Sequence, residues 1–90
     1  MYFVYVLFSM RDRKLYIGFT TDIERRMGEH QGSLVSSTRE RLPIKLIYYE
    51  AYLTRGEAER RERYLKGGNG RQHLKMQLSE TLKDCGYKHL

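Results

Sequence analysis

Four side chains of this sequence could together hydrolyse a phosphodiester. They are the phenols of Tyr5 and Tyr16, the guanidinium of Arg26 and the carboxylate of Glu62. Such a reaction requires removal of a proton from the attacking water, neutralisation of charge on the phosphate and stabilisation of the leaving oxygen. A deprotonated phenol can accept the proton and a neutral one can orient the water, a guanidinium pairs with phosphate, and a lone carboxylate suits Mg²⁺. His30, an imidazole that ordinarily titrates near neutrality, could assist or replace a tyrosine as the base.

The elements that must position these residues follow the predicted order β-β-α-β-α-α. Residues 2–8 form a continuous aromatic and aliphatic run, which is typical of a central strand buried on both faces. Apolar patterning and turn residues place the other elements: strands at 15–20 and 44–52, and helices at about 21–30, at about 54–66 and across Leu74, Leu78 and Leu82.

The first two strands are expected to form a hairpin that brings the tyrosines together. A four-residue turn pairs Tyr5 with Gly18 and Leu7 with Tyr16, so the two phenols share a face as diagonal neighbours. Gly18 would then leave an opening opposite Tyr5. Because side chains alternate between faces, a slip of one residue would put the tyrosines on opposite faces.

Local signals set the helix ends and the longest connection. Thr21 and Thr54, each followed three residues later by a glutamate, predict capping boxes at the starts of the first two helices. The glycine cluster at residues 67–70 is expected to end the second helix. Residues 31–43 show no clear periodicity and predict a mobile surface loop.

Helical spacing puts two charged residues on faces that packing would leave apolar. Arg26 lies on the inner stripe between Ile23 and Met27, whereas Arg25 points to solvent. Glu62 lies on the inner face of the second helix. A partly buried charge needs a partner. Two readings therefore stay open: an ordinary ion pair, either of Arg26 with Glu62 or of Glu62 with Arg61 or Arg63, or a shared site for a charged ligand.

The charge balance favours a polyanionic partner. The 90-residue chain has 17 lysines and arginines against 11 acidic residues, a net charge of +6. Such an excess attracts nucleic acid, although solubility alone could explain it. Arg39, Arg41 and Arg61 are the predicted contacts to a nucleic-acid backbone, and the loop around Thr38 and Arg39 is the predicted substrate contact.

Other features exclude several classes of protein. A single cysteine rules out an internal disulfide and a multi-thiolate zinc site. The sequence shows no signal peptide and no apolar run of the ~20 residues that a membrane span needs. We therefore expect a reduced, cytoplasmic protein without a membrane partner. It should fold as a single domain over residues 1–84, with a C-terminal tail at 85–90.

Together these motifs resemble the GIY-YIG nuclease superfamily. Phe3-Val4-Tyr5 and Tyr16-Ile17-Gly18 match its two tyrosine motifs, followed at the expected spacings by Arg26 and Glu62. The resemblance covers about residues 2–78. It is closest to small stand-alone bacterial members and extends to the nuclease module of bacterial excision repair. It implies an α+β fold with a three-stranded antiparallel sheet flanked by helices.

The resemblance also implies roles for the candidate residues. Tyr5 and Tyr16 would serve as base and water-orienting residue, in either assignment. Arg26 would clamp the phosphate, and Glu62 would bind a single divalent metal, Mg²⁺ or Mn²⁺. His30 matches a histidine of some branches of the superfamily.

Two departures from the pattern affect these roles. Phe3 replaces the glycine of the first motif, and Phe19-Thr20 stand where the repair nucleases have a lysine. Another cation, such as Lys14 or Arg26, would then have to lower the pKa of the tyrosine. Asn69 aligns only loosely with a late polar residue of other members and is a further candidate for nucleic-acid binding, as is Gly18.

The sequence therefore predicts a metal-dependent DNA endonuclease. Its substrates would include branched or damaged DNA in repair or recombination, with a binding specificity that is either low or supplied by a protein partner. The main alternative is a non-catalytic basic nucleic-acid-binding module on the same fold. A third hypothesis, supported by charge alone, is an interaction protein for acidic partners or RNA.

Overall fold

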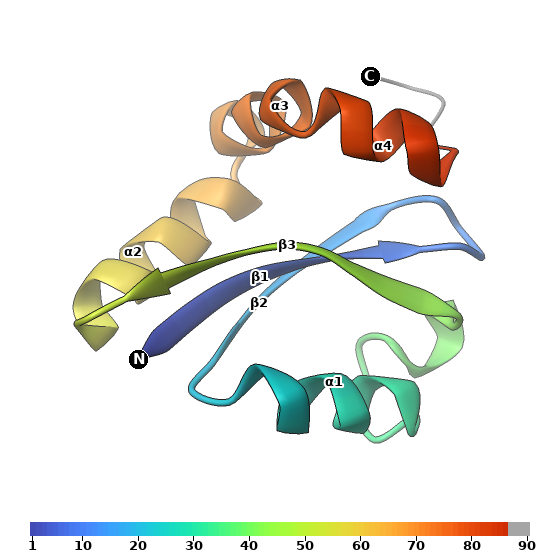
Figure 1. The fold of residues 1–90 in the computed structure, drawn as a ribbon, viewed down its shortest axis with the longest axis horizontal. Helices are drawn as coiled ribbons and strands as arrows, with labels where there is room; N and C mark the ends of the chain where they lie inside the picture. The colour runs from blue at the N-terminus through green and yellow to red at the C-terminus, as the bar shows by residue number, and fades with distance from the viewer. Residues whose placement is uncertain (87–90) are drawn as a thin grey trace.

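The computed structural model describes residues 1–86 as a sheet between two layers of helices. In Figure 1, helix α1 lies on one side of the sheet and α2, α3 and α4 lie on the other. Residues 87–90, most of the predicted tail at 85–90, lie outside the described residues. The elements are β1 (Tyr2–Ser9), β2 (Leu15–Thr20), α1 (Ile23–Gln31), the 3-10 helix η1 (Arg39–Arg41), β3 (Ile44–Tyr52), α2 (Arg55–Lys66), α3 (Gly68–Gln77) and α4 (Ser79–Cys85).

The sheet is antiparallel with the order β2-β1-β3, which confirms the predicted α+β fold and the central position of β1. Tyr5 pairs with Gly18 and Leu7 with Tyr16, so the predicted register is also confirmed. No helix within residues 1–86 is long and apolar enough to cross a membrane.

Strand β1 is buried on both faces because it contributes to two separate cores. Alternate residues of β1 face the layer of α2, α3 and α4, where Val4, Val6 and Phe8 pack against Leu65 and Leu74. The intervening residues face α1, and these include Tyr5 and Leu7. Candidate catalytic residues on the α1 side therefore form part of a core.

Of the two predicted capping boxes, the one at Thr54 forms the predicted helix cap, although the Glu57 carboxylate accepts from the Thr54 hydroxyl at 2.6 Å and not from its backbone N–H. The hydroxyl of Thr54 accepts a hydrogen bond from the Glu57 backbone N–H at 3.3 Å and starts α2. The box at Thr21 is wrong, because α1 starts one residue later. There the carboxylate of Asp22 accepts from the Arg25 N–H at 3.1 Å. Aspartate caps a helix as well as a hydroxyl does, and the sequence offered both in succession.

The C-terminal segment forms two helices where one was predicted. Helix α3 begins inside the glycine cluster and ends before Leu78, and α4 begins directly after Leu78. Gly67 ends α2 as expected, but Gly70 has a different function. A Cβ atom at Gly70 would overlap the backbone carbonyl of Tyr64. The missing side chain thus lets α3 pass closely over the end of α2.

The connection between α1 and β3 is more embedded than a surface loop. Val35 and Thr38 are buried, which contradicts that prediction for the middle of the segment. The hydroxyl of Ser9 donates to the Arg41 carbonyl at 2.6 Å, and the Met10 N–H donates to the Pro43 carbonyl at 2.8 Å. Long-range contacts of this kind leave no periodic signal in the sequence.

Candidate active site

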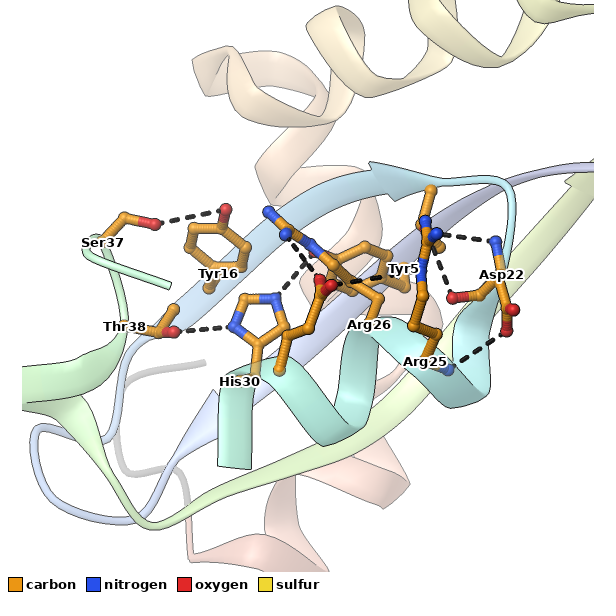
Figure 2. Close-up of polar contacts among 10 residues, drawn as sticks. Tyr5, Tyr16, Asp22, Arg25, Arg26, His30, Ser37 and Thr38 are labelled. Atoms are coloured by element: carbon orange, nitrogen blue, oxygen red, sulfur yellow. Dashed lines mark hydrogen bonds and ion pairs between the residues drawn. The ribbon is translucent and has the colours of Figure 1, made fainter. Parts of the chain in front are cut away.

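Four of the predicted catalytic residues meet on the α1 side of the sheet. Tyr5 and Tyr16 come from neighbouring strands, and Arg26 and His30 come from successive turns of α1 (Figure 2). The two phenol rings lie 6.3 Å apart between centroids, and the His30 ring lies 5.7 Å from Tyr5 and 5.4 Å from Tyr16. The cluster follows from the hairpin register on one side and the helical repeat on the other.

Gly18 makes room for this cluster. It is buried beneath Tyr5, and a Cβ atom at Gly18 would overlap the phenol ring. The opening predicted opposite Tyr5 is therefore filled by the ring of Tyr5 itself. In this structure Gly18 acts as a space for the phenol and lies away from the surface where nucleic acid could bind.

A chain of hydrogen bonds runs through the cluster. Arg26 Nε donates to the Tyr5 hydroxyl at 3.3 Å, and that hydroxyl lies 2.8 Å from His30 Nε2. His30 Nδ1 lies 2.6 Å from the hydroxyl of Thr38. Because the Tyr5 oxygen already accepts from Arg26, we assign its proton to the bond with Nε2. His30 then carries its own proton on Nδ1 and donates it to Thr38.

Burial governs the proton affinities of these groups. His30 has no exposed surface. Burial, reinforced by the nearby Arg26, lowers its pKa from 6.5 to about 4. This overturns the expectation that His30 titrates near neutrality. Burial likewise raises the pKa of Tyr5 to about 12, against the lowering effect of the hydrogen bond from Arg26. Both groups are therefore neutral at pH 7.

Tyr16 is the phenol of the pair that reaches solvent. It is half-buried, whereas Tyr5 is completely buried. Its hydroxyl accepts a bond from the Ser37 hydroxyl at 3.3 Å, at the exposed rim of the cluster (Figure 2). A water or phosphate arriving from solvent would meet Tyr16 before Tyr5.

Arg26 is held in place by two partners. Nε binds Tyr5, and Nη1 forms an ion pair with Glu29 at 3.0 Å; both bonds raise the pKa of Arg26. Nη2 makes no hydrogen bond within residues 1–86. Arg25, with 63% of its side chain exposed, is the solvent-facing arginine as predicted. Glu29 was not anticipated, although its spacing three residues after Arg26 favours such a pair.

Glu62 lies in the opposite layer of helices. It lies on α2 with 20% of its side chain exposed, and its carboxylate is 3.1 Å from Lys66 Nζ. Neither of the ion pairs considered for it, with Arg26 or with a neighbouring arginine, is formed. The negative charge of Glu62 is one of the influences that raise the pKa of Tyr5, so the two groups interact electrostatically.

The donor set around Glu62 fits one weakly held hard cation. Residues 1–86 contain no group of three histidine, cysteine, aspartate or glutamate side chains that could hold a metal together. Mg²⁺ commonly binds through one or two carboxylates, with waters and substrate phosphate completing its shell. A single carboxylate at Glu62 matches that pattern and does not match a structural zinc site.

The predicted substrate contacts differ in accessibility. Arg39 is exposed at the start of η1, and Asn69 is exposed in the first turn of α3. Thr38, in contrast, is completely buried and uses its hydroxyl to hold His30. Thr38 therefore supports the imidazole of His30, and a substrate could not reach it.

Two of the arginines predicted to contact the nucleic-acid backbone already have carboxylate partners within the protein. Arg41 Nε lies 2.7 Å from an oxygen of Asp12. Arg61 binds both oxygens of Glu50, at 2.9 Å and 3.1 Å. The Arg61 pair lies on the α2 side of the sheet, where Glu50 also accepts hydrogen bonds from tyrosines. Arg61 is therefore chiefly a structural link between α2 and β3.

Comparisons with known proteins identify the family of this chain. The profile of the GIY-YIG catalytic domain matches residues 1–75. The UPF0213 protein CPE1444 of Clostridium perfringens is 36% identical over 89 residues, covering 98% of this chain and 95% of that protein. The UPF0213 protein HQ_3675A of Haloquadratum walsbyi is 39% identical over 80 residues, covering 88% of this chain and 86% of that protein.

A solved structure is also similar. The solution NMR structure of the UPF0213 protein BH0048 from Bacillus halodurans is 32% identical, covers 97% of this chain and 87% of that chain, and gives a TM-score of 0.46. None of these relatives is named for an activity. By the extent of the profile match and of the identity to its relatives, this chain belongs to the GIY-YIG catalytic-domain family and, within it, to the UPF0213 proteins.

Proposed function

We propose that this protein is a metal-dependent DNA endonuclease, which hydrolyses phosphodiester bonds of DNA. A single domain over residues 1–84 would carry this activity. Membership of the GIY-YIG family implies a capacity for phosphodiester hydrolysis. The observation that carries the proposal is the convergence of Tyr5, Tyr16, Arg26 and His30 in one cluster of hydrogen bonds and tilted or edge-on ring contacts. An ordinary core would have placed apolar side chains there.

Tyr16 is the residue that meets the attacking water in this proposal. It is the half-buried phenol, so its hydroxyl can orient the water, and as a phenolate it would take the proton of the water; the buried Tyr5 cannot reach solvent. Tyr5 and His30 support the site from within the core. The hydrogen bond between them fixes the Tyr5 ring, which Tyr16 and Arg26 both contact. The neutral imidazole accepts a hydrogen bond from the Tyr5 hydroxyl without adding a positive charge to a buried cluster.

Arg26 clamps the scissile phosphate. Two of its three nitrogens are engaged by Tyr5 and Glu29, which fixes the plane of the guanidinium. Nη2 remains to donate to a phosphate oxygen. A guanidinium fixed before the substrate arrives loses little conformational freedom on binding, and its charge-assisted bond to phosphate is a strong one.

Glu62 is the proposed ligand of a single Mg²⁺ or Mn²⁺. Its present partner Lys66 is half exposed, and an ion pair of this kind is worth only about 0.5 kcal/mol, so it would not prevent metal binding. When bound, the metal supplies Lewis-acid stabilisation of the phosphate and the leaving oxygen. The chain's own contribution is one carboxylate at a mostly buried position.

Binding of DNA rests on the basic surface. The net charge of +6 attracts the phosphate backbone, with exposed Arg39 and Asn69 as contacts and Arg41 partly available beside Asp12. The substrate is proposed to be branched or damaged DNA, recognised with a protein partner that adds specificity. Because such binding releases counterions, affinity should fall steeply with salt.

A cleavage panel tests the proposal. Wild-type protein is incubated with single-stranded, duplex, nicked, flap and four-way DNA in Mg²⁺ or Mn²⁺, beside Arg26→Ala. Metal-dependent cleavage of at least one substrate, reduced at least 100-fold in the variant, supports an endonuclease. The matched control Arg25→Ala removes an exposed arginine from the same helix and should keep the wild-type rate.

The alternative is a nucleic-acid-binding module without turnover. One observation favours it: the carboxylate of Glu62 already has a cationic partner, Lys66. A Mn²⁺ titration by calorimetry separates the two functions. Binding that Glu62→Gln removes supports the endonuclease. DNA binding without cleavage, and without any metal binding that depends on Glu62, supports the module.

A further inference from the structure

A second basic site lies outside the catalytic cluster, at the hairpin end of the sheet. It is a cavity of about 460 Å³, a size typical of small-ligand sites. The walls come from the β1–β2 hairpin, η1 and α3, and they carry four cations against one carboxylate. The lining residues are Asp12, Lys14, Leu15, Arg41, Arg71 and Lys75.

Two guanidinium groups converge in this cavity. Arg41 Nη2 and Arg71 Nη1 each lie 3.5 Å from the backbone carbonyl oxygen of Leu15. They approach it from different elements, since Arg41 belongs to η1 and Arg71 to α3. Both arginines are partly buried. Bringing like charges together at a partly desolvated position is unfavourable unless an anion lies between them.

The carboxylate in the cavity balances only part of this charge. Asp12 binds Arg41 through both oxygens, at 2.7 Å and 3.4 Å. The side chains of Lys14 and Arg71 form no ion pair within residues 1–86. The cavity thus holds uncompensated positive charge, with forked N–H donors of the geometry that suits phosphate oxygens.

The wall that carries Asp12 and Lys14 is rigidly held. The Lys14 N–H donates to Asp12 at 2.9 Å, and the Asp12 N–H donates to the hydroxyl of Ser9 at 3.1 Å. The next turn residue, Arg13, donates from Nη1 to the Gly86 carbonyl at 2.7 Å and so ties the hairpin to the end of α4. A cavity fixed in advance loses little freedom on binding a ligand.

We propose that this cavity binds a phosphate group of the nucleic-acid strand, separate from the phosphate that is cleaved. The proposal rests on the proposed endonuclease function. Leu15 lines the cavity and precedes Tyr16 on β2, which is an edge strand of the sheet. The two side chains face opposite sides of the sheet, so a nucleic-acid strand would pass around the edge of β2 to reach both sites. Free inorganic phosphate offers the same chemistry, so the test must distinguish the two sources.

The test measures DNA affinity without catalysis. A fluorescent duplex oligonucleotide is titrated in EDTA at several salt concentrations with wild-type protein, Arg71→Gln and Lys14→Gln. Each variant removes one cation. The slope of log K against log salt should fall in magnitude by about 0.9, and Kd should rise roughly 5- to 10-fold at ~0.1 M salt. Lys14 is exposed and its side chain forms no ion pair in the described part of the chain, so its variant should fold even if Arg71→Gln does not.

Arg60→Gln is the matched control, an exposed arginine on α2 outside the cavity. An equal loss of slope in Arg60→Gln would overturn the proposal, because it would show that the salt dependence comes from surface charge in general. Wild-type slopes in both cavity variants would also overturn it, even if wild-type protein cleaves DNA. Reduced slopes without any cleavage would support the cavity and refute the endonuclease. Calorimetry could instead show that the protein binds inorganic phosphate and that Arg71→Gln abolishes this binding while the DNA slope stays unchanged. This result would assign the cavity to free phosphate and overturn the proposal that it binds a nucleic-acid strand.

Discussion

The hydroxyl of Tyr5 lies 2.8 Å from Nε2 of His30, and both side chains are completely buried. This bond joins the central strand β1 to the last full turn of α1. Through Thr38 it also fixes the segment that leads to β3. The polar cluster proposed for catalysis is therefore part of the packing between α1 and the sheet. Substitutions in it should separate into those that change stability and those that change chemistry.

The two tyrosines should differ in this respect. Tyr5→Phe leaves His30 Nε2 buried without a donor, which is expected to reduce the free energy of unfolding by ~1–3 kcal/mol. Tyr16→Phe removes only a long bond to exposed Ser37 and should change stability by less than ~0.5 kcal/mol. Its cleavage rate should nevertheless fall by ~10²–10⁴. Urea unfolding and single-turnover cleavage measure the two effects, and equal destabilisation by both changes would contradict the structure.

Thr38 should act through His30. Thr38→Val keeps the shape of the buried side chain but removes the oxygen that lies 2.6 Å from Nδ1. The expected loss is about 1–2 kcal/mol in the free energy of unfolding, because the imidazole N–H is left unpaired. The neighbouring exposed Ser37→Ala is the control and should lie close to wild type. A Thr38→Val protein as stable as Ser37→Ala would show that the hydroxyl does not hold the imidazole.

The burial of His30 predicts how stability depends on pH. Because the pKa of His30 is lowered from 6.5 to about 4 on folding, the unfolded chain binds the extra proton first as pH falls. The folded protein, in which His30 is neutral, therefore keeps its full stability above pH ~6.5. Its free energy of unfolding falls by up to about 3 kcal/mol as the pH falls towards ~4.

Urea unfolding of wild type and His30→Gln between pH 4 and 7 measures this effect. The variant should be less stable at pH 7 and should show a flatter dependence on pH. His73→Gln changes an exposed histidine on α3 and should keep the wild-type profile. A profile unaltered by His30→Gln would mean that His30 titrates normally in the folded protein.

Arg26 should not tolerate replacement by lysine. Its three nitrogens are assigned to Tyr5, to Glu29 and to the phosphate, and a single ammonium group cannot serve all three. Arg26→Lys is expected to lower the single-turnover rate by about 10- to 100-fold. Arg25→Lys, at the exposed neighbouring position, should leave it unchanged. Similar losses in both variants would indicate that positive charge on α1, rather than the guanidinium geometry, is what matters.

Local patterns predicted the parts of the site that depend on local geometry. The short hairpin and the alternation of strand side chains were sufficient to place Tyr5 opposite Gly18 and Tyr16 on the same face. The helical repeat placed Arg26 inward and Arg25 outward. These relationships depend on spacings of a few residues, which packing at long range does not alter.

The parts that were missed depend on contacts between distant segments. The low pKa of His30 follows from burial against Tyr5 and Thr38, and Thr38 lies in a segment without periodicity. The start of α3 within the glycine cluster depends on how closely Gly70 approaches the backbone of Tyr64. No pattern along the chain reports such distances.

The central claim is that the carboxylate of Glu62 completes a hydrolytic site with the cluster on α1. Single-turnover cleavage of branched DNA in Mg²⁺ tests it most directly, comparing wild type with Glu62→Gln and with Glu59→Gln one turn earlier on α2. We predict cleavage that EDTA abolishes, a loss of at least 100-fold in Glu62→Gln and a wild-type rate in Glu59→Gln. Cleavage that persists in Glu62→Gln, or that falls equally in both variants, would contradict the account.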